Sequence, residues 1–112
     1  MREEFARAGI VFPDFLWPVD EQRPDEDRKA YWLRAIRELR PGVSELFIHA
    51  SLETDDMKRM TGRPADGGWQ ERATEFELFT RDADIRTALT AAGVKRIGYR
   101  PLRDLQRRGN RP

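Results

Sequence analysis

The chain has 112 residues, with 21 basic and 20 acidic side chains, one histidine and no cysteine, so its formal net charge is +1. This length is typical of one domain or of part of a larger one. The near-neutral balance excludes a globally basic nucleic-acid binder, and the lack of cysteine excludes disulfide scaffolds and thiolate metal sites. No apolar run approaches the roughly 20 residues of a membrane-spanning helix, and the start lacks the apolar core of a signal peptide. The composition therefore predicts a folded, cytoplasmic protein.

The first part of the chain predicts a helix, an apolar stretch and a loop, in that order. Residues 2–8 are expected to form a short helix with Gly9 at its C-terminal cap. Residues 10–17 are apolar and predicted to be buried, but they include a proline, so a strand here is short or lies at a sheet edge. Residues 18–28 are polar and contain two prolines, which predicts a loop whose Pro24 begins the next helix.

The middle of the chain carries the strongest helix and strand signals. Apolar side chains recur at helical spacing up to Leu39, and Pro41-Gly42 ends this helix. Residues 43–50 (VSELFIHA) are short, apolar and bounded by turn residues, which predicts a strand. A helix followed by such a strand is typical of a parallel α/β unit. The inner face expected for the helix is formed by Tyr31, Trp32, Ala35, Ile36 and Leu39.

The second half of the chain predicts further helices and one more strand. Residues 94–99 (VKRIGY) predict that strand, and residues 61–68 (TGRPADGG) predict a loop by composition. Residues 108–112 are expected to fray as a tail. The helices of this half are expected at residues 53–60, 69–79 and 82–92 and from Pro101 onward.

Apolar spacing also predicts which side of these later helices faces inward. In the helix at residues 69–79 the apolar side is expected to hold Trp69, Ala73 and Phe76, with Phe79 continuing it. The helix at residues 82–92 places its apolar residues at i, i+3, i+4 and i+7, with Gly93 as its cap. The alternation of helices and strands predicts an α/β fold with right-handed crossovers.

The segment 39–51 (LRPGVSELFIHAS) resembles the L-x-P-G-V-T/S-E-L-x-x-H-P-G/A segment of the YdjC-like (ChbG-type) carbohydrate deacetylases. Residues 84–102 resemble the closing motif of that family, S-P-E-V-R-x-x-L-x-x-x-G-I-x-L-I-S-Y-R-x-L. The motifs occur in the family's order and cover most of residues 31–105. The family's W-x-x-R-x-x-D/E helix is matched by Trp69, Arg72 and Glu75.

The resemblance implies a (β/α) barrel, related to polysaccharide deacetylases, that removes acetyl groups from N-acetylated oligosaccharides. It therefore implies an α/β fold that is part of such a barrel, with about three short parallel strands and four to five helices. Residues 1–112 are then a single domain or the C-terminal part of a larger barrel. Ala50 stands where the family usually has proline.

A divalent metal, Mg²⁺ or Zn²⁺, is the cofactor that the resemblance implies for the full family member. In the family, an aspartate and two histidines of the N-terminal half hold this metal. This chain has one histidine and lacks those N-terminal motifs, so it is assigned no metal ligands and no cofactor of its own. We therefore expect the chain to be inactive alone.

His49 is the expected catalytic residue, because the resemblance makes it a candidate acid for the departing amine and a histidine titrates near neutral pH. The alternative is a histidine that only satisfies a strand-end hydrogen bond. Glu45, on the same strand face, either orients His49 or pairs with a core arginine such as Arg72. Arg72 and Glu75 lie three residues apart on a helix and either form an ion pair or rim the substrate cleft. Trp69 is the tryptophan most expected to face a cleft and stack on a sugar ring.

Two charged clusters favour structural interpretations. The acidic residues at 53–56 match no metal-loop spacing and are typical of a helix start. The C-terminal arginines have no base-reading motif beside them, so nucleic acid is disfavoured as a partner, and no membrane partner is expected. The alternative function is a non-catalytic α/β interaction module. Since part of a barrel leaves strand edges unpaired, such a module forms a homo-oligomer or pairs with a missing N-terminal segment.

Overall fold

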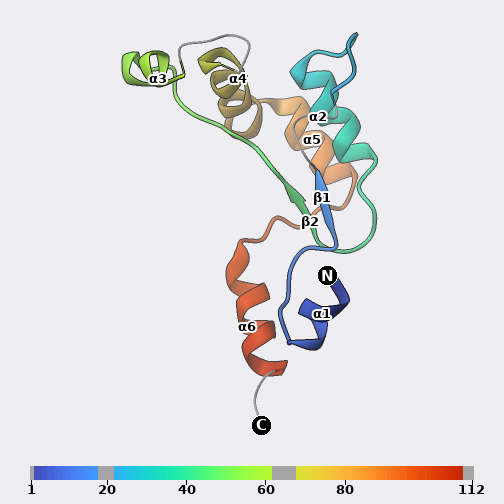
Figure 1. Ribbon diagram of the computed structural model, residues 1–112. Helices are drawn as coiled ribbons and strands as arrows, with labels where there is room; N and C mark the ends of the chain where they lie inside the picture. Colours follow the sequence, from blue (N-terminus) through green and yellow to red (C-terminus); the bar gives the residue numbers. More distant parts are fainter. Residues whose placement is uncertain (1, 18–21, 62–67, 110–112) are drawn as a thin grey trace.

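The structure is a computed structural model that describes residues 2–17, 22–61 and 68–109. Much of the predicted loops and tail, at residues 18–21, 62–67 and 110–112, lies outside these described residues. Within them, six helices and two strands follow one another along the chain, and the last four elements are all helices (Figure 1). The elements are α1 (Arg2–Arg7), β1 (Phe15–Trp17), α2 (Arg28–Arg37), β2 (Ser44–Leu46), α3 (Asp55–Met60), α4 (Trp69–Thr80), α5 (Ala83–Ala91) and α6 (Tyr99–Gly109).

The strands β1 and β2 pair in parallel, with Phe15 opposite Ser44 and Trp17 opposite Leu46. The chain between them contains α2, so β1, α2 and β2 form the predicted parallel α/β unit. The α/β class is therefore confirmed. The described residues hold two strands of three residues each, whereas a partial barrel led us to expect about three strands.

The prediction of a strand at residues 94–99 is wrong. Residues 94–98 have no regular structure and are largely exposed, and Tyr99 already begins α6. A strand satisfies its backbone amides on a neighbouring strand. Among the residues that the structure describes, only β1 pairs with β2. The helices number six in the described ranges, where four to five were expected.

The core lies where α2 packs against α4 and α5. Four side chains of α2 are fully buried, as their spacing predicts, and Leu39 is half-buried. The helix starts later than expected, because Asp27 rather than Pro24 begins it: the Asp27 side chain accepts a hydrogen bond from the backbone N–H of Ala30. The fully buried residues of α2 are Tyr31, Trp32, Ala35 and Ile36.

The prediction of which side of α4 faces the core is wrong. Its buried residues are Glu75 and Leu78, whereas Trp69, Ala73 and Phe76 are only half-buried. These two sets lie on different sides of the helix, because each residue is rotated by about 100° about the helix axis from the one before it. The hydrophobic pattern missed this orientation because a carboxylate occupies the buried side.

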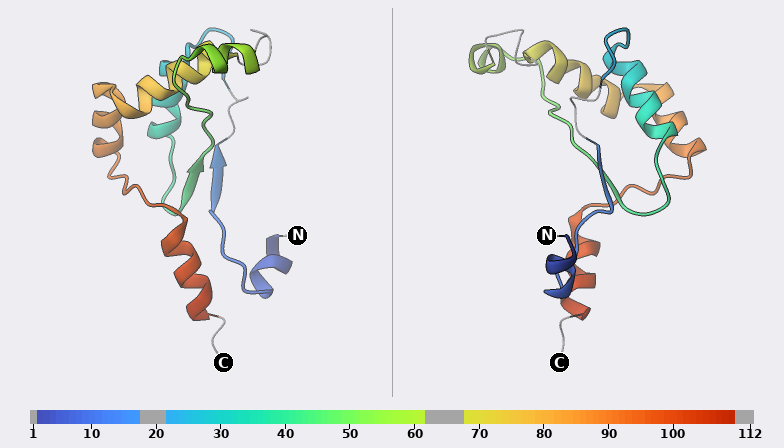
Figure 2. Two further views of the ribbon diagram at one scale, coloured as in Figure 1. Left: turned by 90° about the vertical axis from the view of Figure 1, so that its left-hand side faces the viewer. Right: turned by 45° about the vertical axis from the view of Figure 1, so that its right-hand side comes forward.

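The remaining helices, α1 and α6, lie together at the end of the molecule away from α3 and α4 (Figures 1 and 2). The backbone N–H of Val11 donates to the side-chain oxygen of Gln106 at 3.0 Å, which ties this end together. The predicted caps Gly9 and Gly93 are confirmed, since both have the positive φ of a helix C-terminus. No helix in the described part of the chain has the length and apolar character needed to cross a bilayer.

Candidate functional site

The centre of the candidate site is the carboxylate of Glu75, a residue only 2% exposed. The indole N–H of Trp32 donates to its Oε1 at 3.2 Å, and the backbone N–H of His49 donates to its Oε2 at 2.7 Å. Arg28 Nε lies 3.9 Å from Oε1 and supplies a positive charge. A buried carboxylate needs such partners to offset its lost hydration. Glu75 therefore joins α2, α4 and the segment that follows β2.

His49 lies just beyond β2 and is exposed. Its ring packs edge-on against the ring of Phe47, with the centroids 4.8 Å apart. The hydrogen bond that fixes this residue is made by its backbone, and no hydrogen bond to its ring occurs among the described residues. The imidazole is thus accessible to an external ligand while the chain that carries it is held in place.

Arg72 contacts the same segment through its backbone. Its carbonyl oxygen accepts a hydrogen bond from the N–H of Ser51 at 3.1 Å, so α4 binds the histidine segment at two points. Within the described part of the chain, Arg72 forms no ion pair with Glu75, whose cationic partner is Arg28. The Nε of Arg72 is buried with no hydrogen-bond partner among the described residues.

Glu45 lies in β2 opposite Leu16 and contacts α6. Its carboxylate accepts a hydrogen bond from the hydroxyl of Tyr99, which raises the pKa of that hydroxyl above its usual range. The partners expected from the sequence were His49 and Arg72. Neither side chain hydrogen-bonds to Glu45 in the ranges that the structure describes.

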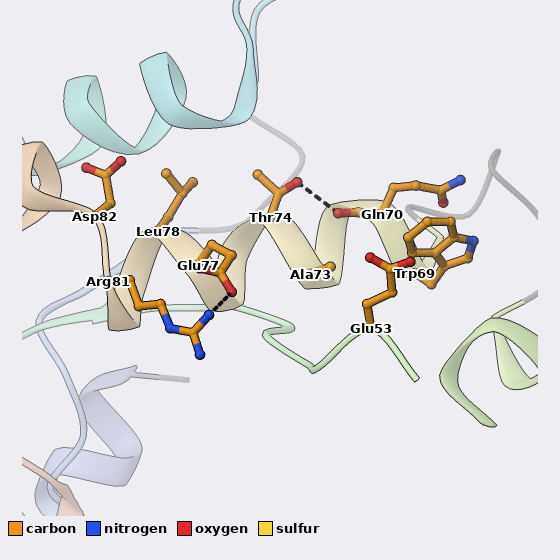
Figure 3. A pocket seen from close by; sticks show the side chains of 9 residues that line it. All are labelled: Glu53, Trp69, Gln70, Ala73, Thr74, Glu77, Leu78, Arg81 and Asp82. Atoms are coloured by element: carbon orange, nitrogen blue, oxygen red, sulfur yellow. Dashed lines mark hydrogen bonds and ion pairs between the residues drawn. The ribbon is translucent and has the colours of Figure 1, made fainter. Parts of the chain in front are cut away.

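Trp69 lies at one end of a groove of about 550 Å³ that runs along α4 (Figure 3). Lys58 Nζ lies 4.7 Å from the centre of the indole and pairs with Glu53 at 2.7 Å. Arg81 and Asp82 line the other end. Trp69 therefore lines this groove, and its role in stacking on a sugar ring stays a prediction.

The candidate residues thus occupy three places. The segment of His49 is joined to Glu75 and Arg72, whereas Glu45 lies on the sheet and Trp69 lies in the groove. Sequence reasoning missed Arg28 and treated Trp32 as a core residue alone. A hydrogen bond from Trp32 could have been predicted from the sequence, because a buried indole N–H requires an acceptor.

The described residues do not fit the metal that the resemblance implies. None of their His, Asp and Glu side chains form a group of three or more that could hold a metal ion. The acidic pair Asp55 and Asp56 instead lies in the first turn of α3, whose N-cap is Thr54. With one histidine in the whole sequence, a two-histidine ligand set needs a residue from elsewhere.

Comparisons of the chain with protein-family models, with curated proteins and with solved structures find no match. The similarity to the YdjC-like deacetylases therefore rests on the sequence motifs themselves.

Proposed function

We propose that this chain carries the proton-donating part of a metal-dependent deacetylase that acts on N-acetylated oligosaccharides. One observation supports this most directly: the segment of His49 is hydrogen-bonded to the buried Glu75 while the imidazole stays open to solvent. The two residues are 26 positions apart and belong to two of the motifs that resemble the family.

In this proposal the oxygen of a water molecule adds to the acetyl carbonyl carbon. His49 then donates a proton to the amide nitrogen as the bond between that nitrogen and the carbon breaks, which releases acetate and the free amine. An amine leaves poorly unless it is protonated, and imidazole holds an available proton near neutral pH. Glu75 is a positioning residue, since it contacts the backbone of His49 and not the substrate. The metal-holding residues come from outside the described part of the chain.

The test measures acetate release from N-acetylglucosamine oligomers by the protein expressed with its natural upstream coding sequence. We expect His49→Asn to lower turnover by about 100-fold or more, because general acid catalysis contributes 10²–10⁴-fold. Arg37→Ala, at an exposed position on α2, is the control and should retain turnover. Full activity of His49→Asn overturns the role of His49 as proton donor. Acetate release by the 112-residue chain alone overturns the proposal that its site is incomplete.

A second candidate is the non-catalytic interaction module, and the open side of the sheet favours it. Trp17 and Leu46 pack toward the core, whereas Leu16 on the other side is 62% exposed. In the described residues each strand pairs on one side only, and open strand edges readily pair with another chain. Such a module would bind a protein partner and release no acetate in the same assay.

A further inference from the structure

One side of the sheet formed by β1 and β2 faces away from the core. Figure 2 shows α2 and α5 on the opposite side of the two strands. Along the strands and the residues that follow β2, alternate side chains pack against that core. The residues between them point outward, and two of these, Leu16 and Phe47, are 62% and 48% exposed. The side chains that pack against the core are Trp17, Leu46 and Ile48.

Three side chains of different chemistry form a row on this outer side. Glu45, Phe47 and His49 alternate with the core-facing residues, so they follow one another along the chain's outer side. The ring of Phe47 lies edge-on to the imidazole of His49, with 4.8 Å between the centroids. At the other end of the row, the Glu45 carboxylate accepts a hydrogen bond from the Tyr99 hydroxyl. The row therefore holds a hydrogen-bond acceptor, an aromatic ring and the candidate proton donor within about 13 Å, at about 3.3 Å per residue.

Trp69, the aromatic residue expected from the sequence to contact sugar, is less well placed than Phe47. The groove that Trp69 lines runs along a different side of α4 from Glu75, whose carboxylate holds the backbone of His49. Lys58 Nζ lies 4.7 Å from the centre of the indole, so a cation already covers one side of that ring. The ring that contacts the imidazole directly is the phenyl ring of Phe47.

We infer that Phe47 forms the subsite for the sugar unit that loses its acetyl group, with the acetamide of that sugar directed toward His49. This inference rests on the proposed function and names the residue that positions its substrate. A sugar ring has an apolar face of C–H groups and a rim of hydroxyl groups. Binding sites match such a ligand with an aromatic surface and a few well-placed polar groups. Phe47 supplies the surface, and the Glu45 carboxylate accepts a hydrogen bond from a hydroxyl of the same or the adjoining sugar.

The experiment measures binding of the disaccharide of N-acetylglucosamine to the 112-residue chain by ligand-observed NMR titration. We expect Phe47→Ala to weaken binding by about tenfold or more, because truncating an aromatic anchor removes most of its contact area. Phe47→Leu should weaken binding similarly, since leucine is apolar but has no flat ring, whereas Phe47→Trp should retain it. Phe47 is 48% exposed, so these changes leave the core intact, and circular dichroism verifies the fold.

The matched control is Met60→Ala, which removes an apolar side chain that is 81% exposed on α3 and should bind the disaccharide like the wild type. Trp69→Ala tests the rival position in the α4 groove. A larger loss of affinity in Trp69→Ala than in Phe47→Ala places the sugar in that groove and overturns the inference. Wild-type affinity in Phe47→Ala overturns it as well, as does a wild type that does not bind the disaccharide.

This measurement separates the subsite from the proposed function, because it follows binding and requires neither a metal nor turnover. If Phe47→Ala loses binding while His49→Asn retains full acetate release, the subsite stands and the role of His49 as proton donor is overturned. If His49→Asn loses acetate release while Phe47→Ala binds like the wild type, the proton donor stands and the subsite is overturned.

Discussion

The Glu75 carboxylate accepts a hydrogen bond from the backbone N–H of His49 at 2.7 Å and thereby fixes the segment after β2 to the inner side of α4. Glu75 is 2% exposed, whereas His49 is exposed. Burial strengthens this hydrogen bond and also makes the loss of either partner more damaging. The position of the candidate acid and the stability of the core therefore depend on one side chain.

Replacing Glu75 with glutamine should destabilise the fold. The amide keeps one oxygen but turns an NH₂ group toward either the Trp32 indole or the His49 N–H, both of which are donors. It also removes one of the two carboxylates that pair with Arg28, and Glu71 remains. A buried donor left without an acceptor costs about 1–3 kcal/mol, and we expect the free energy of unfolding in urea to fall by about that amount.

Glu77→Gln is the matched control, because Glu77 lies on the same helix with its side chain 54% exposed and paired with Arg81. An exposed pair of this kind contributes about 0–1 kcal/mol, so this variant should unfold almost like the wild type. Equal stabilities for the two variants would show that the Glu75 hydrogen bonds contribute nothing to the fold.

The sequence predicted those elements whose signal is local. The buried side of α2 follows from the spacing of Tyr31, Trp32, Ala35 and Ile36, because one helix period places them together. The cap at Gly93 likewise depends on neighbouring residues only.

The errors concern relationships between distant residues. The buried side of α4 is set by the donors that Glu75 finds on Trp32 and His49, 43 and 26 positions away, and hydrophobicity alone gives no sign of them. The predicted strand at residues 94–99 needed a partner strand, which is a property of the assembled sheet. The same holds for Glu45, whose partner Tyr99 lies in another element.

Truncating Ile85 tests whether α5 is part of the core. Ile85 is 1% exposed and belongs to the cluster that includes Tyr31 and Ile36 of α2. Ile85→Ala leaves a cavity and should lower the free energy of unfolding by about 2–5 kcal/mol. The matched control is Ile97→Ala, at a residue that is 47% exposed, for which we expect a change of about 0.5 kcal/mol or less. A small effect at Ile85 would mean that α5 does not pack as the structure places it.

Gly42 occupies a position that a larger residue cannot take without strain. Its φ is +129°, and a Cβ here would lie 2.9 Å from Asp14 Oδ2, which accepts a hydrogen bond from the Val43 N–H. Gly42→Ala should therefore destabilise the protein by about 1–3 kcal/mol in thermal or urea unfolding. Gly98→Ala has open space around the new methyl group and should be neutral or slightly stabilising. The prediction fails if the two variants are equally stable.

The ion pair of Glu26 and Arg34 predicts how stability depends on pH. Both Glu26 oxygens accept hydrogen bonds from the Arg34 guanidinium at 2.9 Å, and this lowers the pKa of Glu26 from 4.5 to about 2. Because the folded-state pKa lies below the unfolded one, the pair stabilises the protein fully above about pH 4.5. Its contribution declines as the pH falls toward about 2, where the folded protein also takes up the proton.

The measurement is the difference in free energy of unfolding between the wild type and Glu26→Gln, followed from neutral pH to about pH 2. Glutamine cannot titrate, so the difference isolates the ionised form of this one carboxylate from all other groups. We expect the wild type to be the more stable at neutral pH and the difference to shrink steadily below about pH 4.5. If this difference in free energy of unfolding is the same at neutral pH and at about pH 2, the ionised Glu26 carboxylate does not pair with Arg34. Glu38→Gln, which removes a half-exposed partner of the same arginine at 3.4 Å, should change stability little at neutral pH.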